Sequence, residues 1–537
     1  MTTCDGQSLP PPTGSPSSVA PARVELSRKD WLWQPSLIVF ISNACIMTIE
    51  LVAGRLVAPY VGVSLYTWTS IIGVILAGIS VGNYIGGRVA DRLASRRMLG
   101  LLFALAGLGS FSILGTVTVF GEAGLPRIAG LPLVARMALY FASIFFLPSA
   151  LLGAISPLVV KLTLQDLSKT GGVIGRIYAA SALGSILGTF ATGYFLIQWF
   201  GTRAILLGVG VILLVIALLI GQWTRRGIVP AIVALGVIAA PFVFPVRSIL
   251  AGPCLRETNY FCIKVREDIR EDRVTYMTLI LDRLVHSYTA LENPTKLAYG
   301  YEKVGAEVLE YVEGRDGRLS TFFIGGGGYT LPKYVEYVYP DSTIDVAEID
   351  PGVTLVAHEL LGLRRDTLIR TFNEDARLVL THLDEAQRYN FVMGDAFNDF
   401  SVPYHLTTHE FNQLVRRHLT DDGIYMLNLI DGPGQSFVGA FLRTLRRTFD
   451  HLYLIPTGHN WQTLARNTYV ILASPAPINL EKLRHLYGGD AQLAVDDWLV
   501  SEGQLRAVMG NGVIILTDDY APTDRLLAPM FEASEAW

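Results

Sequence analysis

Apolar residues follow two different patterns along this chain, and the change between them divides it. From residue 36 to residue 247 they form seven long runs, most of them near the ~20 residues that a helix needs to cross a bilayer. Small residues recur within the runs, which allows helices to approach closely in lipid. We therefore expect a multi-pass α-helical membrane domain over residues 36–247, after a disordered Pro- and Ser-rich tail over residues 1–35. The runs are Leu37–Tyr60, Tyr66–Gly87, Leu99–Phe120, Val134–Val160, Ile177–Phe200, Ala204–Gln222 and Ile228–Val246.

After residue 247 the apolar runs become short and alternate with polar turns. Three β-rich segments at 260–268, 273–283 and 285–291 predict a small antiparallel β domain over residues 248–300. From residue 301 to residue 537, strand-like runs such as LSTFFIGGGG and YNFVMGDAF alternate with helix-like ones. This alternation predicts a Rossmann-like α/β domain with a parallel sheet, which binds ligands at the carboxyl ends of its strands.

The amino-acid composition supports the division into a membrane domain and a soluble domain, and it excludes some classes of binding partner. Only 17% of the residues are charged, against ~25% in soluble domains. The net charge of −4 gives no polybasic surface, so no nucleic-acid partner is expected. The four cysteines form no zinc pattern, and we expect no metal site. Cys254 and Cys262 flank one short stretch and could form a disulfide in an oxidising compartment, so their state stays open.

Lysine and arginine residues lie between alternate runs, which orients the predicted helices. Cytoplasmic loops carry an excess of these residues. They precede the first run, follow the second, surround the loop between the fourth and fifth, and follow the sixth, so they share one side. These residues are Arg23, Arg28, Lys29, Arg88, Arg92, Arg96, Arg97, Lys161, Lys169, Arg176, Arg225 and Arg226. The stretch GGRVADRLASRR at 86–97 also resembles the loop after the second helix of major facilitator transporters.

Two charged residues, Glu50 and Arg55, fall inside the first run. Charges at such positions are costly and usually face a partner or a cavity. They are either an ion pair that locks the bundle or part of a path for a substrate or ion, and both interpretations stay open.

Four glycines, Gly325, Gly326, Gly327 and Gly328, end one predicted strand and open a helix. Glycine allows a tight turn and lets a ligand lie against the backbone. A dinucleotide motif needs a further glycine at position 330, where the chain has Thr330, so a nucleoside without phosphates fits better.

Acidic residues end the next three strands. Glu348 can accept both hydroxyls of a ribose, Asp375 with Ala376 can hold an adenine amino group, and Asp395 lies over the predicted pocket. Because these strand ends share one edge of the sheet, we expect the three acids to form one site.

These residues resemble the spermidine synthases, or polyamine aminopropyltransferases, in their membrane-fused branch, over about residues 260–454. The resemblance implies a small β domain before a methyltransferase-type Rossmann-like domain. It also implies transfer of an aminopropyl group from decarboxylated S-adenosylmethionine, as co-substrate, to putrescine or a related amine, with release of methylthioadenosine. No other cofactor is implied.

The resemblance also implies roles for individual residues. Asp395 would be the catalytic base that takes a proton from the amine, Glu348 the ribose acceptor, and Asp375 with Ala376 the adenine pair. Tyr301 and Glu302 would lie against the polyamine, and His286 falls near the same pocket, where it is either a contact or a packing residue.

Three positions depart from the family pattern. Gly328 replaces an aspartate that holds the amine end of the donor, Phe261 replaces a glutamine, and Asn398 replaces a second acid of the catalytic loop, although we still count Asn398 with the substrate-binding residues. The nucleoside half is therefore preserved and the amine half altered. The alternative is a nucleoside- or polyamine-binding domain that regulates a transporter-like membrane half, and a transporter with an accessory domain is a further rival.

Expected partners are the amine and nucleoside-sulfonium substrates and membrane lipid, and a homo-oligomer stays open. Seven spans that start in the cytosol would place the soluble domain outside, away from a donor made in the cytosol. The run Ile228–Val246 contains three prolines and is the weakest span. We therefore expect a multi-pass protein of the cell membrane with a cytoplasmic catalytic domain, while the parity of the spans leaves this open.

One further motif, HLTTHE at 405–410, has a metal-like HxxxH spacing. Thr407 and Glu410 within it also form a capping-box pattern, which we prefer.

Overall fold

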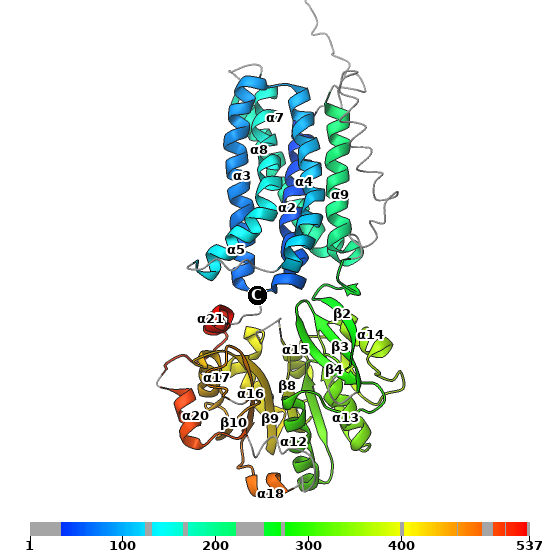
Figure 1. Cartoon of the computed structure of the whole chain (residues 1–537), viewed down its shortest axis with the longest axis vertical. Coiled ribbons are helices and arrows are strands. Elements are labelled where there is room, and N and C mark those ends of the chain that lie inside the picture. Colours follow the sequence, from blue (N-terminus) through cyan, green and yellow to red (C-terminus); the bar gives the residue numbers. More distant parts are fainter. Residues whose placement is uncertain are drawn as a thin grey trace, which may run out of the picture.

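The computed structural model describes residues 34–123, 131–164, 170–221, 252–269, 274–397, 402–458, 460–485, 498–510 and 512–533. It has a bundle of long apolar helices and, at one end of that bundle, an α/β domain (Figure 1).

The bundle matches the predicted runs as far as it is described. Each of the first four runs lies in a long helical stretch, and the fifth and sixth share the stretch 170–220, which breaks at Gly201 with φ 73° and ψ 163°. The seventh run, Ile228–Val246, lies outside the described residues. The helices are α2 (Pro35–Val61), α3 (Leu65–Leu93), α4 (Arg96–Ala123), α5 (Leu133–Phe141), α6 (Leu147–Gly153), α7 (Ile155–Thr163), α8 (Thr170–Ala191) and α9 (Ile197–Ile220).

Small residues bring these helices into close contact, as the sequence predicted. A Cβ at Gly184 of α8 would lie 2.1 Å from the carbonyl oxygen of Phe40 in α2. A Cβ at Gly82 of α3 would lie equally close, 2.1 Å, to the carbonyl oxygen of Ala150 in α6. Larger residues at these positions would force the helices apart.

The small antiparallel sheet is confirmed. Its strands β1 (Arg256–Glu257), β2 (Cys262–Ile269), β3 (Thr275–Leu281) and β4 (Leu284–Ala290) pair in sequence order. Cys254 and Cys262 form a disulfide with a Cα–Cα distance of 5.2 Å, which joins this sheet to the segment that approaches the bundle.

The larger sheet has the order β10-β11-β9-β8-β5-β6-β7. Its first five strands in the chain are parallel, as predicted, but β11 pairs antiparallel with both β9 and β10, so the prediction of a parallel sheet was incomplete. The strands are β5 (Ser320–Ile324), β6 (Thr343–Ala347), β7 (Arg370–Phe372), β8 (Tyr389–Gly394), β9 (Leu419–Asp431), β10 (His451–Pro456) and β11 (Asn467–Ser474). The order reverses between β5 and β8, where such sheets open a crevice for ligands.

Helices cover both faces of this sheet. Phe322 packs with side chains of the helices on one face and Phe323, its neighbour in β5, with those on the other, as alternation along a strand requires. The first face carries α15 (Ala376–His382), α16 (His409–Arg417) and α17 (Ser436–Leu445), and the second carries α12 (Gly300–Asp316), α13 (Thr330–Val338) and α14 (Pro351–Leu360).

The two parts meet through polar contacts. The Arg55 guanidinium, near the end of α2, donates to the carbonyl oxygens of Asn259 at 2.6 Å and Tyr260 at 2.8 Å, and also to that of Thr258. The structure records no ion pair between Arg55 and Glu50 among the described residues, so the first of the two interpretations, an ion pair that locks the bundle, is not observed. Arg55 instead fastens the bundle to the α/β domain.

A group of exposed aromatic side chains lies at this same end of the bundle, between residues 194 and 200. Trp199 is 68% exposed, and aromatic residues with polar edges favour the interface between lipid and water. Trp199 also lines a cavity of about 350 Å³ at the junction, together with Leu255 and Glu257 of the α/β domain. The exposed aromatic residues are Tyr194, Phe195, Trp199 and Phe200.

Candidate active site

The predicted glycine turn lies where β5 and β8 end side by side. Gly325 has φ 97°, and a Cβ there would lie 2.4 Å from the carbonyl oxygen of Asp395, so this position requires glycine. The turn therefore brings the backbone of residues 325–328 against the start of the loop after β8.

Glu348 follows β6 and lies beneath this turn. Its Oε2 accepts hydrogen bonds from the amides of Gly326 at 2.8 Å and Gly327 at 3.1 Å, and its Oε1 accepts one from Asp350 at 2.9 Å. Burial raises the pKa of Glu348, and the three amide bonds oppose that shift. A carboxylate offers about four acceptor positions, so one position remains that can accept a hydrogen bond from a ribose hydroxyl.

Asp375 lies further along the edge and already has two partners. Its Oδ1 accepts from the amide of Arg377 at 2.8 Å, and its Oδ2 lies 2.8 Å from Nε2 of His405. Burial raises the pKa of Asp375, but the His405 contact and the backbone amides of Arg377 and Leu378 together outweigh it, and the net shift is downward. Ala376, the other predicted adenine residue, is buried as the first residue of α15.

The HLTTHE motif serves this region structurally. His405 pairs with Asp375, whereas His409 lies near Thr448, at 3.2 Å from its hydroxyl. No cluster of metal-binding side chains occurs among the described residues. The N-cap of α16 is Thr408, which accepts from Phe411, so the predicted cap at Thr407 was wrong by one position.

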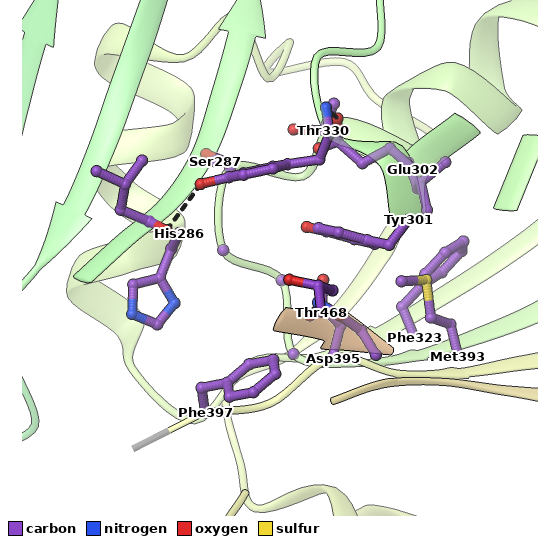
Figure 2. A pocket seen from close by; sticks show the side chains of 18 of the residues that line it. His286, Ser287, Tyr301, Glu302, Phe323, Thr330, Met393, Asp395, Phe397 and Thr468 are labelled. Atoms are coloured by element: carbon purple, nitrogen blue, oxygen red, sulfur yellow. Dashed lines mark hydrogen bonds between the residues drawn. The ribbon is translucent and has the colours of Figure 1, made fainter. Parts of the chain in front are cut away.

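Asp395 is the first residue after β8 and faces a cavity of about 80 Å³ (Figure 2). Asn428 of β9 donates to its Oδ1 at 2.8 Å, and the Tyr301 hydroxyl is a second donor. Burial raises the pKa of Asp395 to about 6, although both hydrogen bonds oppose the shift. The carboxylate is therefore held in place and is ionised above that pH.

Aromatic rings form one wall of this cavity. Tyr301 points toward Asp395 and stacks on Tyr299 with ring centroids 5.4 Å apart, and Tyr299 in turn lies 5.1 Å from Tyr288. Such rings can hold the apolar stem and the charge of an alkylammonium group.

Glu302 has a structural role in addition to the predicted one. Its Oε2 accepts from the amides of Ala298 at 3.1 Å and Tyr299 at 3.0 Å, which caps α12. Burial raises the pKa of Glu302 to about 8, so the group carries a proton at neutral pH. Its Oε1 has no hydrogen-bond partner among the residues that the structure describes, and the Glu302 side chain lines the cavity.

Five cavity-lining side chains, Glu302 included, have buried polar atoms without hydrogen-bond partners among the described residues. Buried polar groups are normally paired, so a polar ligand in the cavity is the natural partner. His286 is one of them, and burial, with help from Arg466, lowers its pKa to about 4, so it is neutral. The atoms are His286 Nε2, Ser287 Oγ, Glu302 Oε1, Thr330 Oγ1 and Asn428 Oδ1.

Sequence reasoning missed Ser287, Thr330 and Asn428. Asn428 could have been found, because it is the one amide in the apolar strand GIYMLNLI. Ser287 and Thr330 carry no signal of their own, since their role depends on which strand and turn meet in the fold.

The structure gives a reason for the glycine at position 328. A Cβ there would lie 2.0 Å from Ser287 Oγ and 3.1 Å from Thr289 Oγ1, so two hydroxyls occupy the space that an acidic side chain would need. Phe261 is buried and packs 6.3 Å from the ring of His286. Asn398 lies outside the described residues.

The structure thus brings together most of the predicted residues. The cavity is lined by Asp395, Tyr301, Glu302, His286 and the glycine turn. Glu348 contacts the turn from outside this lining, and Asp375 is further away with its own partners.

Comparison with known proteins gives one consistent similarity, although no profile of a known protein family matches the chain. A polyamine aminopropyltransferase of Vibrio vulnificus is 33% identical over 106 residues, which is 20% of this chain and 36% of that protein. A polyamine aminopropyltransferase of Corynebacterium efficiens is 26% identical over 433 residues, 74% of this chain and 77% of that protein. The crystal structure of a probable spermidine synthase from Corynebacterium glutamicum is 19% identical with a TM-score of 0.41, over 48% of this chain and 95% of that one.

The chain therefore spans only about a third of the Vibrio protein that it matches. The match to the Corynebacterium efficiens protein is longer than the α/β domain and must extend into the bundle, since it covers 74% of the chain. The predicted resemblance to polyamine aminopropyltransferases is confirmed.

Proposed function

We propose that the α/β domain is an aminopropyltransferase that moves an aminopropyl group from decarboxylated S-adenosylmethionine to putrescine or a related amine. The observation that carries this proposal is the position of Asp395 at the end of β8, where Asn428 and Tyr301 donate hydrogen bonds to it and its carboxylate faces the cavity. The similarity to polyamine aminopropyltransferases supports it.

The reaction needs a base because the amine nucleophile carries a proton in water. Asp395 would accept that proton, the free amine would attack the carbon next to the sulfonium, and the C–S bond would break as the C–N bond forms. Methylthioadenosine leaves as a neutral thioether. The raised pKa of Asp395 brings its basicity closer to that of the amine while leaving it ionised at neutral pH.

The nucleoside half of the proposed site consists of the glycine turn and the acids around it. Glu348 would share its carboxylate between the turn and a ribose hydroxyl, and Asp375 with Ala376 would lie beside the adenine. Tyr301, Glu302, His286 and Asn398 would contact the aminopropyl group or the amine.

A direct test uses the full chain in lipid nanodiscs with decarboxylated S-adenosylmethionine and putrescine. The proposal expects release of methylthioadenosine, measured by chromatography, and none when S-adenosylmethionine replaces the donor. If methylthioadenosine binds but several amines give no turnover, the enzyme proposal fails.

That outcome would favour a second function, in which a nucleoside- or polyamine-binding domain regulates a transporter-like bundle. One observation supports it. Arg55 of α2 holds the carbonyl oxygen of Thr258, Thr258 Oγ1 donates to Asp350 at 2.6 Å, and the amide of Asp350 donates to Glu348. A membrane helix is thus linked by hydrogen bonds to the proposed ribose acceptor.

A further inference from the structure

In the part of the chain that the structure describes, the α/β domain contacts one end of the bundle, which we call the docking end. Here α2 ends, α3 begins and the chain turns at Gly201 (Figure 1). Three contacts define it. Arg55 binds the segment 258–260, Glu257 Oε2 accepts from the amide of Thr202 at 3.1 Å, and Asp524 Oδ2 accepts from the amide of Leu65 at 3.2 Å. We call the opposite end the distal end.

The directions of the helices follow from the residues that meet. In α2 and α8, residues 40 and 44 lie against Gly184 and Gly188, so these helices are parallel. In α4 and α9, Gly100 meets Gly221, and Gly107 meets Leu214, so these helices are antiparallel.

The chain therefore crosses the bundle six times between Pro35 and Gly221. The second crossing is α3 and the fourth is α5 to α7. These two crossings are parallel, because Gly82 lies against Ala150 and Gly86 against Ala154. Gly221 returns to the distal end, where Pro35 also lies. Gly252, the next described residue, lies at the docking end, since a Cβ on it would meet the Arg203 side chain at 2.6 Å. Gly221 and Gly252 therefore lie at opposite ends of the bundle.

Positive charge distinguishes the two ends. Of the nine lysine and arginine residues in the described part of the bundle, six lie toward the distal end. At the docking end, Arg55 is bound to the α/β domain, and Arg203 donates to Tyr60 and Thr118. Because cytoplasmic loops carry the excess of positive residues, the distal end is the cytoplasmic one. Its six residues are Arg88, Arg92, Arg96, Arg97, Lys161 and Arg176.

The disulfide is an independent observation that also places the docking end outside the cytoplasm. Cys254 and Cys262 lie in the segment that meets the docking end, and Cys262 lines the junction cavity. Disulfides persist in oxidising compartments and are rare in the cytosol. The docking end is therefore the side on which a disulfide is expected.

We propose that the α/β domain, with the cavity at Asp395, faces the extracytoplasmic side of the membrane. This is the opposite of the cytoplasmic position that we expected from the source of the donor. The site then draws its ligands, a nucleoside and an amine under the proposed function, from outside the cytosol. The proposal concerns the compartment of the site and holds for whichever reaction the site performs.

Cysteine labelling in intact cells tests the topology without requiring activity. In full-length protein with Cys4→Ser and Cys45→Ala, the disulfide is kept and one reporter cysteine is added at a time. Val513→Cys places it on the α/β domain, where Val513 is 91% exposed, and Ser95→Cys places it at the distal end between α3 and α4. The probe is a membrane-impermeant maleimide, and an endogenous cytosolic thiol protein in the same cells reports leakage.

We expect the impermeant maleimide to label Val513→Cys in intact cells and Ser95→Cys only after lysis. Labelling of Ser95→Cys in intact cells, or protection of Val513→Cys until lysis, would overturn the proposal. Both reporters lie outside the site, so these outcomes leave the proposed reaction untouched. Conversely, a chain that shows no turnover but labels as expected would contradict only the proposed function.

Discussion

At the residue scale, Asp395 combines a raised pKa with a fixed orientation. A proton acceptor works only when it is ionised, so kcat/KM should rise as the pH increases through about 6, the pKa of Asp395, and level off above it. Asp395→Asn should lower turnover by ~10²- to 10⁴-fold and remove this pH dependence, because the amide cannot accept the proton. Steady-state rates between pH 5 and 9 measure both effects.

The matched control is Asp341→Asn, which removes an exposed acid far from the cavity. Binding of methylthioadenosine, measured by calorimetry, should be unchanged in both variants. An Asp395→Asn protein that turns over normally would show that another group is the base.

A second residue-scale prediction concerns Gly328. Because the space beside it is filled by Ser287, Gly328→Asp should destabilise the protein by about 1–3 kcal/mol through overpacking. Adding Ser287→Gly should recover the loss and place a carboxylate in the amine half, which should lower the KM for the cationic donor. Thermal unfolding and donor kinetics measure the two effects.

Ser287→Gly alone is the control for the missing hydroxyl. If Gly328→Asp alone is as stable as the wild type, then the crowding at this position does not limit the choice of side chain.

At the element scale, the pattern of apolar residues predicted the strands that carry the site. It did not predict the strands whose place in the sheet depends on which neighbour they pair with. Strands β5, β6 and β8 are recognisable because each is a short, mainly apolar run with a glycine or an acid at its end, and Asp395 and Glu348 were found in this way. The antiparallel pair β10 and β11 was missed because a run of apolar residues does not reveal its strand partner.

Roles that depend on a hydrogen-bond partner elsewhere in the fold could not be predicted from the sequence either. Nothing in the sequence near Asp375 indicates His405, and nothing near Glu302 shows that it caps its own helix. The charge of Arg55 was noticed, but its partners lie more than 200 residues away in the chain.

The link between α2 and the nucleoside half gives a prediction at this scale. Arg55→Gln and Thr258→Val each break one step of the chain of hydrogen bonds that ends at Glu348. If the steps are coupled, each change should weaken methylthioadenosine binding by about fivefold or more, the range of typical coupling energies. Calorimetry on the full chain in nanodiscs measures this.

Lys161→Gln is the control, since it removes a positive charge from the distal end and leaves the docking end intact. Equal methylthioadenosine affinities in the wild type and the three variants would show that the bundle and the nucleoside half are not energetically coupled.

At the scale of the whole molecule, the disulfide fastens the segment at the junction to the small sheet. Replacing both Cys254 and Cys262 with serine should lower stability by about 2 kcal/mol, because the short closed loop gains freedom when unfolded. The apparent melting temperature of the detergent-purified chain should fall accordingly. Reductant should lower it for the wild type and leave the double variant unaffected, and a wild type indifferent to reductant would show that the bond adds no stability.

The exposed aromatic residues at 194–200 also have a consequence for substrate supply. Aromatic side chains favour the level of the lipid headgroups, and Trp199 shares its cavity with Leu255, so we expect the α/β domain to lie close to that level. Where the leaflet at the docking end carries anionic headgroups, these attract cations within about a Debye length, ~8 Å at physiological salt. A polyamine would therefore reach this domain from an enriched surface layer, and its apparent affinity should fall as salt or neutral lipid dilutes that layer.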